Sequence, residues 1–402
     1  MPDKTARSSE SDIAQNSLAK RPKVDSFDND ASGKELMAAT SVTSGSLTRS
    51  VKRVSDLNAP IMHLTGHEGE VVSCKFSPNG RNLATASFDR LILLWNAFGA
   101  AENHHKLAGH TGAVLQVQWS RDGLHIYSSS ADKTVAVWDA VNGERVRKFK
   151  GHTSFVNACS ASRRGPELVA STGDDGLIFL WDPRQKQHAK KFNDPYPLTS
   201  IAFSLDGGSI FAGGIENDIK AWDLRTDNVA YVMAGHDDTI TGLCLNADGD
   251  KLLSNGLDNT GNICVYSKFS IVVLAYFALL ISLYHYTVCH VCQFNYLNLV
   301  RIWDVKPFTL TPSRLSKTFE GAPHGFEKNL IRPCWSPDSQ FIAAGSGDRS
   351  VVVWDVGSSD IVYKLPGHKG CVNDVDWTGS IIVSGSNDKT AFMGELNTSE
   401  VK

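Results

Sequence analysis

Residues 109–139 read GHTGAVLQVQWSRDGLHIYSSSADKTVAVWD, and the features of this stretch return along much of the chain. The stretch opens on a Gly-His pair, continues through two mostly apolar runs separated by an Asp-Gly turn, and ends on an apolar run closed by Trp-Asp. Alternating apolar runs joined by tight turns indicate antiparallel strands. Four short strands fit into one repeat of about 42 residues, so the chain is predicted to be built from small, similar sheets.

The repeat has constant internal spacing from Ile61 onward. Six repeats place a Trp at the end of an apolar run, and in five of them an acidic residue stands six positions before it. About 22 residues before the acid, most repeats carry a Gly-His pair. A seventh repeat ends with Gly394 at the Trp position. The six Trp residues are Trp95, Trp138, Trp181, Trp222, Trp303 and Trp354.

The fifth repeat is interrupted by an insert. Asp258 lies 45 residues before Trp303, and removal of residues 261–299 restores the usual spacing of six. Within the insert, residues 269–284 are uncharged and mostly apolar, a run slightly shorter than the roughly 20 residues that span a bilayer. Because both ends of the insert must return to one small sheet, we expect no membrane association. We interpret the insert as translated intervening sequence or a lineage-specific loop.

These patterns predict an all-β protein, a seven-bladed β-propeller over residues 60–398 with an apolar insert in the fifth blade. The chain ends soon after the third strand of the last blade. We therefore expect the strand near Ile61–Leu64 to complete that blade and close the ring. Residues 1–55 are rich in Ser, Lys, Asp and Ala and have almost no aromatic residues, which predicts a disordered arm.

The recurring His, Asp and Ser residues are components of catalytic triads, but their repetition argues against catalysis. An active site is needed once, whereas a structural network is needed in every blade. No separate cluster of nucleophile, base and acid stands outside the repeats, so we predict that the protein is not an enzyme. We also expect no cofactor, no small-molecule substrate and no metal, because Cys289 and Cys292 lack the second ligand pair that zinc requires.

The whole pattern resembles the WD-repeat family. In that family the imidazole of the Gly-His pair bonds the turn Asp and a strand Ser or Thr, and through the hydroxyl it reaches the Trp indole. The resemblance implies one network of His67, Ser87, Asp89 and Trp95 and a second of His110, Ser130, Asp132 and Trp138. It implies the same structural roles for His152, Asp175, Trp181, Trp222, His236, Asp258, Trp303, Asp348, Trp354, His368 and Asp388.

Two blades depart from this pattern. In the fourth, Asn193 or a neighbour replaces the Gly-His pair and Glu216 replaces the turn Asp. In the sixth, His324-Gly325 reverses the order of the pair. We expect these blades to be looser than the others.

Several stretches outside the generic repeat resemble one narrower family, the WD-repeat subunits of the spliceosomal U-five small nuclear ribonucleoprotein. The specific stretches are Phe326-Glu-Lys-Asn-Leu330 and the ending Met393-Gly-Glu395 in place of Trp-Asp. The resemblance implies a nuclear, non-catalytic scaffold in pre-mRNA splicing, bound to spliceosomal proteins including a Prp-eight-type scaffold. The net charge of −3 agrees with indirect or minor RNA contact, because phosphate binding requires clustered Lys and Arg.

A second function remains open from paired W-D-x-R motifs. Arg184 and Arg225 follow Trp-Asp in adjacent blades, an arrangement that resembles substrate receptors of cullin-RING ubiquitin ligases. In that class the Arg contacts the ligase adaptor, whereas Arg at this position is also common in propellers with other functions.

A compact basic cluster lies within residues 1–55. It consists of Lys20, Arg21 and Lys23 around a proline and is flanked by polar residues. Import receptors read such clusters in exposed segments, so the cluster predicts nuclear import.

Overall fold

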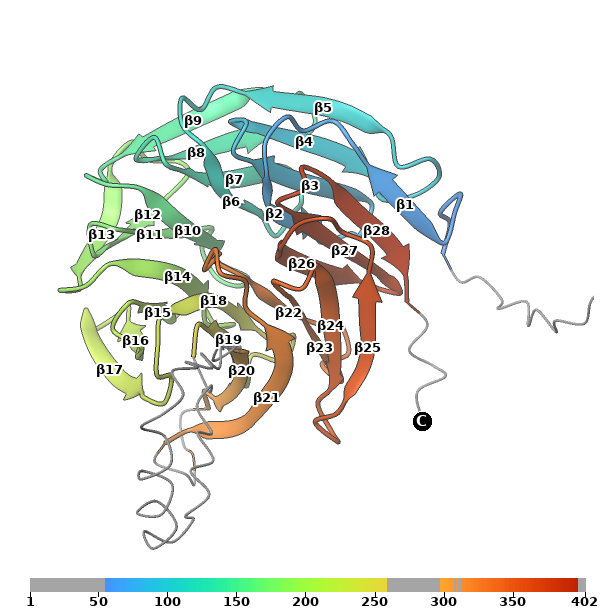
Figure 1. Ribbon diagram of the computed structural model, residues 1–402. Coiled ribbons are helices and arrows are strands. Elements are labelled where there is room, and N and C mark those ends of the chain that lie inside the picture. Colours follow the sequence, from blue (N-terminus) through green and yellow to red (C-terminus); the bar gives the residue numbers. More distant parts are fainter. Residues whose placement is uncertain (1–54, 259–296, 307–308, 310–312, 397–402) are drawn as a thin grey trace, which may run out of the picture. The chain divides into compact units, whose positions relative to one another are not determined.

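The computed structural model describes residues 55–258, 297–306, 309 and 313–396. These residues form seven four-stranded antiparallel sheets arranged as blades around a central axis (Figure 1). The prediction of an all-β, seven-bladed propeller is therefore confirmed. Residues 1–54 of the expected disordered arm, with the basic cluster Lys20–Lys23, and residues 259–296 of the insert lie outside the described residues, whereas Ser55, the last residue of that arm, is described.

Each blade places its first strand next to the axis and its fourth strand at the rim (Figure 1). Blade 1 contains β2 (Val71–Phe76), β3 (Asn82–Ser87), β4 (Leu91–Asn96) and β5 (Asn103–Ala108). Blade 2 contains β6 (Val114–Trp119), β7 (His125–Ser130), β8 (Thr134–Asp139) and β9 (Arg145–Lys150). Blade 3 contains β10 (Val156–Ala161), β11 (Val169–Gly173), β12 (Leu177–Trp181) and β13 (His188–Asn193).

The remaining blades follow the same order, and blade 7 takes its outer strand from the N-terminal side of the propeller. Blade 4 contains β14 (Leu198–Phe203), β15 (Ser209–Gly214), β16 (Ile219–Asp223) and β17 (Asn228–Met233). Blade 5 contains β18 (Ile240–Leu245), β19 (Lys251–Gly256), β20 (Leu297–Asp304) and β21 (Leu315–Pro323). Blade 6 contains β22 (Pro333–Trp335), β23 (Phe341–Gly345), β24 (Ser350–Asp355) and β25 (Ile361–Pro366). Blade 7 contains β26 (Val372–Thr378), β27 (Ile381–Ser386), β28 (Ala391–Glu395) and β1 (Ile61–Leu64).

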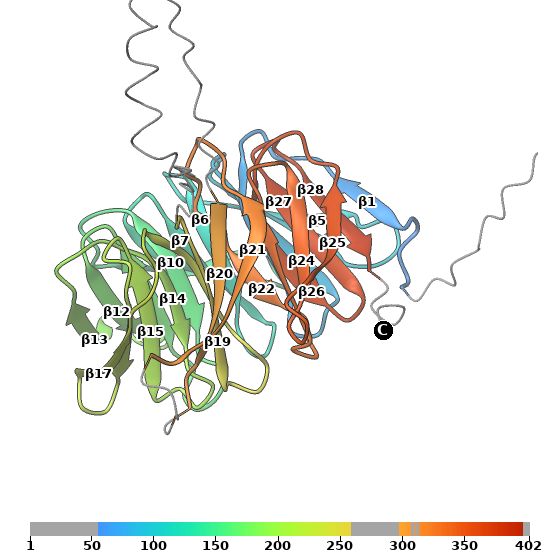
Figure 2. The ribbon, with the colours of Figure 1, turned by 60° about the horizontal axis from the view of Figure 1, so that its bottom comes forward.

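The ring is closed by β1, as the sequence predicts. It pairs antiparallel with β28 in a register that runs from Ile61 opposite Gly394 to Leu64 opposite Ala391 (Figure 1, Figure 2). Beside this seam, the backbone N–H and the hydroxyl of Ser55 donate to the Glu395 carboxylate at 3.0 and 2.9 Å. Residues from the two ends of the propeller therefore share one sheet.

The apolar core lies between blades rather than within them. Trp138 of blade 2, for example, is 1% exposed and packs with Ile92, Leu94 and Leu107 of blade 1. The other five Trp residues pack in the same way on the blade before their own. Since truncating a buried Trp or Phe to Ala costs about 3 to 5 kcal/mol, these contacts hold neighbouring blades together.

Among the described residues, no helix has the length and apolar character needed to cross a bilayer. The apolar run 269–284 is outside them.

The insert ends earlier than the sequence spacing indicates. Strand β20 begins at Leu297, and Leu299 pairs with Gly256, so residues 297–299 belong to blade 5. The register nevertheless agrees with the predicted junction, because Asn255 opposite Val300 repeats the pairing of Ser129 opposite Val135 in blade 2.

Deletion of residues 261–299 should preserve this register and improve folding. The deletion would bring Thr260 to the position of Leu299, two residues after Asp258. In blade 7 the Thr at this position, Thr390, donates its hydroxyl to Asp388 at 2.6 Å. Closing a 39-residue loop costs only a few kcal/mol, but the apolar run favours aggregation. We expect a higher soluble yield and an equal or higher melting temperature.

The matched control is deletion of residues 260–299, which removes one more residue. It shifts the register of β20 by one and would turn its apolar side chains to the wrong face, so its melting temperature should fall. A lower melting temperature for the 261–299 deletion than for the full chain would show that the insert is a structural element.

Candidate functional site

The two faces of the ring carry different loops. Successive strands are antiparallel, so the Gly-His pairs and the turn Asp residues lie on one face, called here the Gly-His face. The first and third strands of each blade end on the opposite face. The first strands of the blades surround the central axis (Figure 1), and the region between them is called here the central channel.

Five blades share one hydrogen-bonded network. In blade 2, His110 Nδ1 lies 3.0 Å from the Asp132 carboxylate, and His110 Nε2 lies 2.8 Å from the Ser128 hydroxyl. The Trp138 indole N–H donates to the same hydroxyl at 2.8 Å. The equivalent His–Asp distances are 2.7 Å for His67–Asp89, 3.0 Å for His152–Asp175, 2.6 Å for His236–Asp258 and 2.9 Å for His368–Asp388.

The hydroxyl of this network is not the one expected from the sequence. Thr85 and Ser128 bind the imidazoles, whereas Ser87 and Ser130 lie two residues further along their strands. The hydroxyls of Ser87 and Ser130 accept the backbone N–H of the turn Asp instead, at 3.1 Å in both blades. The two nitrogens of an imidazole point away from each other, so a ring that holds the turn Asp with Nδ1 reaches deeper into the blade with Nε2.

A signal for the correct hydroxyl is present in the sequence. A Ser or Thr stands ten residues before the Trp in blades 1, 2 and 3, at Thr85, Ser128 and Ser171. At the position equivalent to Ser87 and Ser130, blade 3 has Gly173 and blade 5 has Gly256, neither of which has a hydroxyl.

The electrostatics of the network fix the direction of its hydrogen bonds. Burial alone would raise the pKa of Asp132. Hydrogen bonds from His110, Thr134 and Lys148 outweigh burial, so the pKa of Asp132 is lower than its usual value. In blade 3, burial lowers the pKa of His152, which favours a neutral imidazole, and hydrogen bonds lower the pKa of its partner Asp175. In such a network the indole N–H donates to the hydroxyl, the hydroxyl donates to Nε2, and Nδ1–H donates to the carboxylate. Every polar atom in this buried chain has a partner.

Blades 4 and 6 replace the network by other contacts. In blade 4 Lys220 Nζ binds Asp194 at 2.9 Å and also Glu216, and no described residue bonds the Trp222 indole nitrogen. In blade 6 both ring nitrogens of His324 bond backbone carbonyls of its own loop, at 2.9 Å each.

The Trp and Asp of blade 6 are held differently from those of the five network blades. The Trp354 indole donates to the Glu320 carbonyl at 2.8 Å, and Asp348 is paired with Lys364.

The central channel is crossed by a buried arginine that the sequence analysis missed. Arg332 extends from the inner side of blade 6 and donates to the carbonyls of Val72 at 3.0 Å and Asn157 at 3.3 Å, in blades 1 and 3. Burial lowers its pKa, and the nearby Asp374 opposes that shift. Because this arginine occurs only once, no repeat spacing marks it.

A salt-bridge cluster joins blades 1 and 7 at the channel. Lys75 Nζ lies 3.3 Å from both the Asp374 and the Asp376 carboxylates, and the Ser73 hydroxyl donates to Asp374 at 2.8 Å. The Phe76 backbone N–H donates to Asp376 at 2.7 Å. Opposite charges thus join the first and last blades at their innermost strands, β2 and β26.

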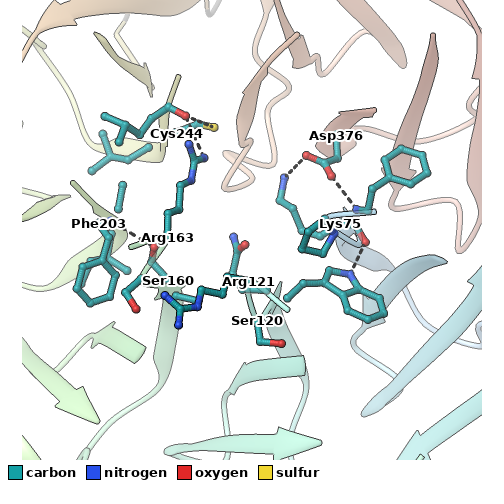
Figure 3. A pocket seen from close by; sticks show the side chains of 18 residues that line it. Lys75, Ser120, Arg121, Ser160, Arg163, Phe203, Cys244 and Asp376 are labelled. Carbon is teal, nitrogen blue, oxygen red and sulfur yellow. Dashed lines mark hydrogen bonds and ion pairs between the residues drawn. The ribbon is translucent and has the colours of Figure 1, made fainter. Parts of the chain in front are cut away.

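The channel opens on the face opposite the Gly-His face in a hollow of about 360 Å³ (Figure 3). Its rim carries Lys75, Arg121 and Arg163, and Asp376 lies beside Lys75 (Figure 3). Arg163 donates to the Asn246 and Leu245 carbonyls, and Arg121 donates to Gly165. All three cations already bond groups of the propeller, so their contacts at this hollow are structural.

The paired Arg residues of the W-D-x-R motifs lie on this same opposite face. Arg184 is 76% exposed in its side chain, and its Nε donates to Asp182 at 3.0 Å. Arg225 is exposed, and its backbone N–H donates to Asp223 at 2.8 Å.

Comparison with known proteins gives both a family and close relatives. The WD domain, G-beta repeat family matches residues 58–96, 101–139, 143–182, 228–263, 324–355 and 359–393. The U5 small nuclear ribonucleoprotein 40 kDa protein of Homo sapiens is 47% identical over 346 residues, 86% of each chain. The pre-mRNA-splicing factor cwf17 of Schizosaccharomyces pombe is 40% identical over 358 residues, 89% of this chain and 92% of that protein. The Dictyostelium discoideum 40 kDa protein is 37% identical over 375 residues, 92% of this chain and 94% of that protein.

Removal of one network imidazole should destabilise the ring without changing what it binds. His110→Ala leaves Asp132 and Ser128 without their shared partner, which should cost about 1 to 3 kcal/mol in the free energy of unfolding. Chemical denaturation measures this loss. The matched control is His104→Ala on the exposed strand β5, which should change stability by less than about 0.5 kcal/mol. Loss of a binding partner by His110→Ala at full stability would instead assign His110 a direct binding role.

Proposed function

Because the chain belongs to the WD-repeat family, and within it to the group of the U5 small nuclear ribonucleoprotein 40 kDa proteins, we propose that it is a non-catalytic scaffold of this ribonucleoprotein in pre-mRNA splicing. Propellers host many unrelated functions, so the fold alone does not favour splicing over other roles. The observation that carries the proposal is the identity of 37 to 47% with splicing proteins over most of both chains.

The geometry of the blades supports a scaffold rather than an enzyme. The His, Asp and Ser or Thr groups that could serve in catalysis are repeated in five blades and are bonded to a buried indole or to one another. A scaffold needs this rigidity, because it presents fixed loops to its partners.

The exposed side chains of the Gly-His face favour a protein partner over a nucleic acid. Five large apolar side chains in its loops are exposed, with Phe326 at 90%. Such residues suit a protein interface, whereas a phosphate backbone would need an excess of cations. The five residues are Phe88, Phe155, Tyr196, Ile215 and Phe326.

We assign the Gly-His face to a Prp-eight-type scaffold protein and place the chain in the nucleus, with Lys20, Arg21 and Lys23 aiding import. RNA contact would then be indirect or minor.

Affinity purification of the tagged chain from nuclear extract tests the proposal. We expect recovery of U5 proteins, including the Prp-eight-type scaffold, together with U5 RNA. Phe326→Ala combined with Phe155→Ala should weaken recovery by roughly tenfold or more, because exposed aromatic residues often dominate protein interfaces. Leu124→Ala combined with Val141→Ala, on the opposite face, is the matched control and should have no effect. Recovery of a cullin adaptor without any U5 protein would contradict the proposal.

The ligase receptor is a second candidate, favoured by the exposure of Arg184 and Arg225 on one face. Arg184→Ala combined with Arg225→Ala separates the two functions in the same purification. Loss of a cullin adaptor with retention of U5 proteins would assign both functions to the chain. Retention of every partner would make the motif incidental.

A further inference from the structure

One interblade position lacks the side chain that fills it in the rest of the ring. Across three blade interfaces, the Trp of one blade contacts an aromatic residue on the outer strand of the blade before it. The ring centroids are 4.9 Å apart for Phe149–Trp181, 5.5 Å for Phe192–Trp222 and 6.4 Å for Phe319–Trp354. Between blades 6 and 7 the strand registers place Leu365 and Gly394 at the corresponding positions.

The missing indole leaves a hollow. A pocket with a cavity volume of about 390 Å³ lies between blades 6 and 7, beside the strand pair that closes the ring. Its lining is mostly apolar and includes Ile61, Val351, Leu365, Phe392 and Leu396. Leu365 is only partly buried, whereas its counterparts Leu107, Phe149, Phe192, Met233 and Phe319 are at most 5% exposed.

The neighbouring aromatic residue does not replace the indole. Phe392 stacks on His63 with centroids 4.7 Å apart and meets the edge of His368 at 4.6 Å. Its counterpart in blade 3 is Phe179, which lies beside Trp181 with both rings present. The position of Phe392 is therefore compatible with an indole next to it.

The backbone does not require glycine at position 394. A Cβ atom added there would lie 3.5 Å from the Pro60 carbonyl oxygen and 3.8 Å from Ile61 Cγ1, which are ordinary contact distances. The residue is also absent from the positions with positive φ. A side chain at 394 would be tolerated, so the hollow is not a by-product of backbone strain.

The hollow also keeps the polar partner of an indole. In blades 1, 2, 3 and 5 the indole N–H donates to the strand hydroxyl that binds the imidazole. In blade 7 this hydroxyl belongs to Ser384, which lies 2.8 Å from His368 Nε2 and lines the hollow. Gly394 supplies no donor to it. The shape and the hydrogen-bond acceptor of a buried Trp are thus both retained without the Trp.

From these observations we infer that the hollow between blades 6 and 7 is a docking site for a tryptophan side chain of a partner protein. The partner's indole would cover Leu365 and donate its N–H to Ser384, as the ring's own Trp residues do in other blades. Apolar cavities of about 150 Å³ bind benzene, so this hollow is large enough for an aromatic ring. Exposed Ile61 and Pro366 at its rim leave it open to the outside of the ring. That the partner is a splicing protein rests on the proposed function, whereas the site itself does not.

The first test uses the purified full chain and N-acetyl-tryptophanamide as the probe, with N-acetyl-alaninamide as the control ligand. We expect saturable binding of the tryptophan probe, with NMR shifts confined to the hollow. Gly394→Trp should abolish this binding and raise the melting temperature, because it restores the missing indole. Val141→Trp, which adds an exposed indole to blade 2, should change neither.

A second variant keeps the test decisive if Gly394→Trp fails to fold. Leu365→Phe fills the hollow from blade 6 with the residue that three other outer strands carry, and it should weaken probe binding by about tenfold or more. Equal binding of the tryptophan and alanine probes would overturn the proposal. So would probe binding that appears only after removal of residues 1–54 or 397–402, because the chain itself would then fill the hollow.

The partner is tested separately by crosslinking in the assembled particle. A photoreactive residue at position 61 should crosslink to a Trp-containing segment of a U5 protein, and Gly394→Trp should remove that crosslink. A crosslink to another part of this chain, or to a partner segment without Trp, would overturn the assignment of the occupant. If the purified chain binds the probe but no U5 protein is recovered with the chain, the proposed function would be refuted, whereas the tryptophan site would be retained.

Discussion

The pairing of β1 with β28 is the constraint on which the rest of the structure depends. Each apolar cluster of the described residues joins two neighbouring blades, so none of them is a separate core that could hold an open ring together. Closure joins residues that are more than 300 positions apart, and the entropy cost of that contact must be met by the strand pairing and by the polar contacts beside it. The Lys75–Asp374–Asp376 cluster joins the same two end blades, 1 and 7, at the central channel.

Much of this architecture could be predicted from the sequence because the repeat encodes it directly. The spacing of Trp, turn Asp and Gly-His gave the blade count and located the fifth-blade insert, and the short final repeat indicated the closing strand. The hydroxyl that bonds the imidazole was predicted wrongly, at Ser87 and Ser130. Thr85 and Ser87 lie two residues apart and face the same side of their strand, so the sequence pattern does not separate them. Only the reach of the imidazole decides between them. Arg332 could not be predicted at all, since it occurs once and its partners lie in blades distant in sequence.

In a repeat protein, the regular blades can be compared directly with the blades that depart from the repeat. In blade 4 a lysine replaces the imidazole, and Lys220 still ties two acidic groups together. In blade 7 no side chain among the described residues replaces the Trp, and the pocket there keeps an apolar lining and the Ser384 hydroxyl. The first departure is compensated within the chain, and the second leaves surface for another molecule. That difference locates a specific contact on a fold whose general features are shared by proteins of many functions.

The role of the β1–β28 pairing in holding the ring closed can be measured by thermal unfolding of two truncations. Removal of residues 1–54 leaves β1 intact, and removal of residues 1–64 deletes it. The first truncation should unfold cooperatively at the melting temperature of the full chain. The second should lose the cooperative transition or melt far lower, because β28 becomes an open edge and blade 7 loses its outer strand. Equal melting temperatures for the two truncations would show that this pairing does not hold the ring closed.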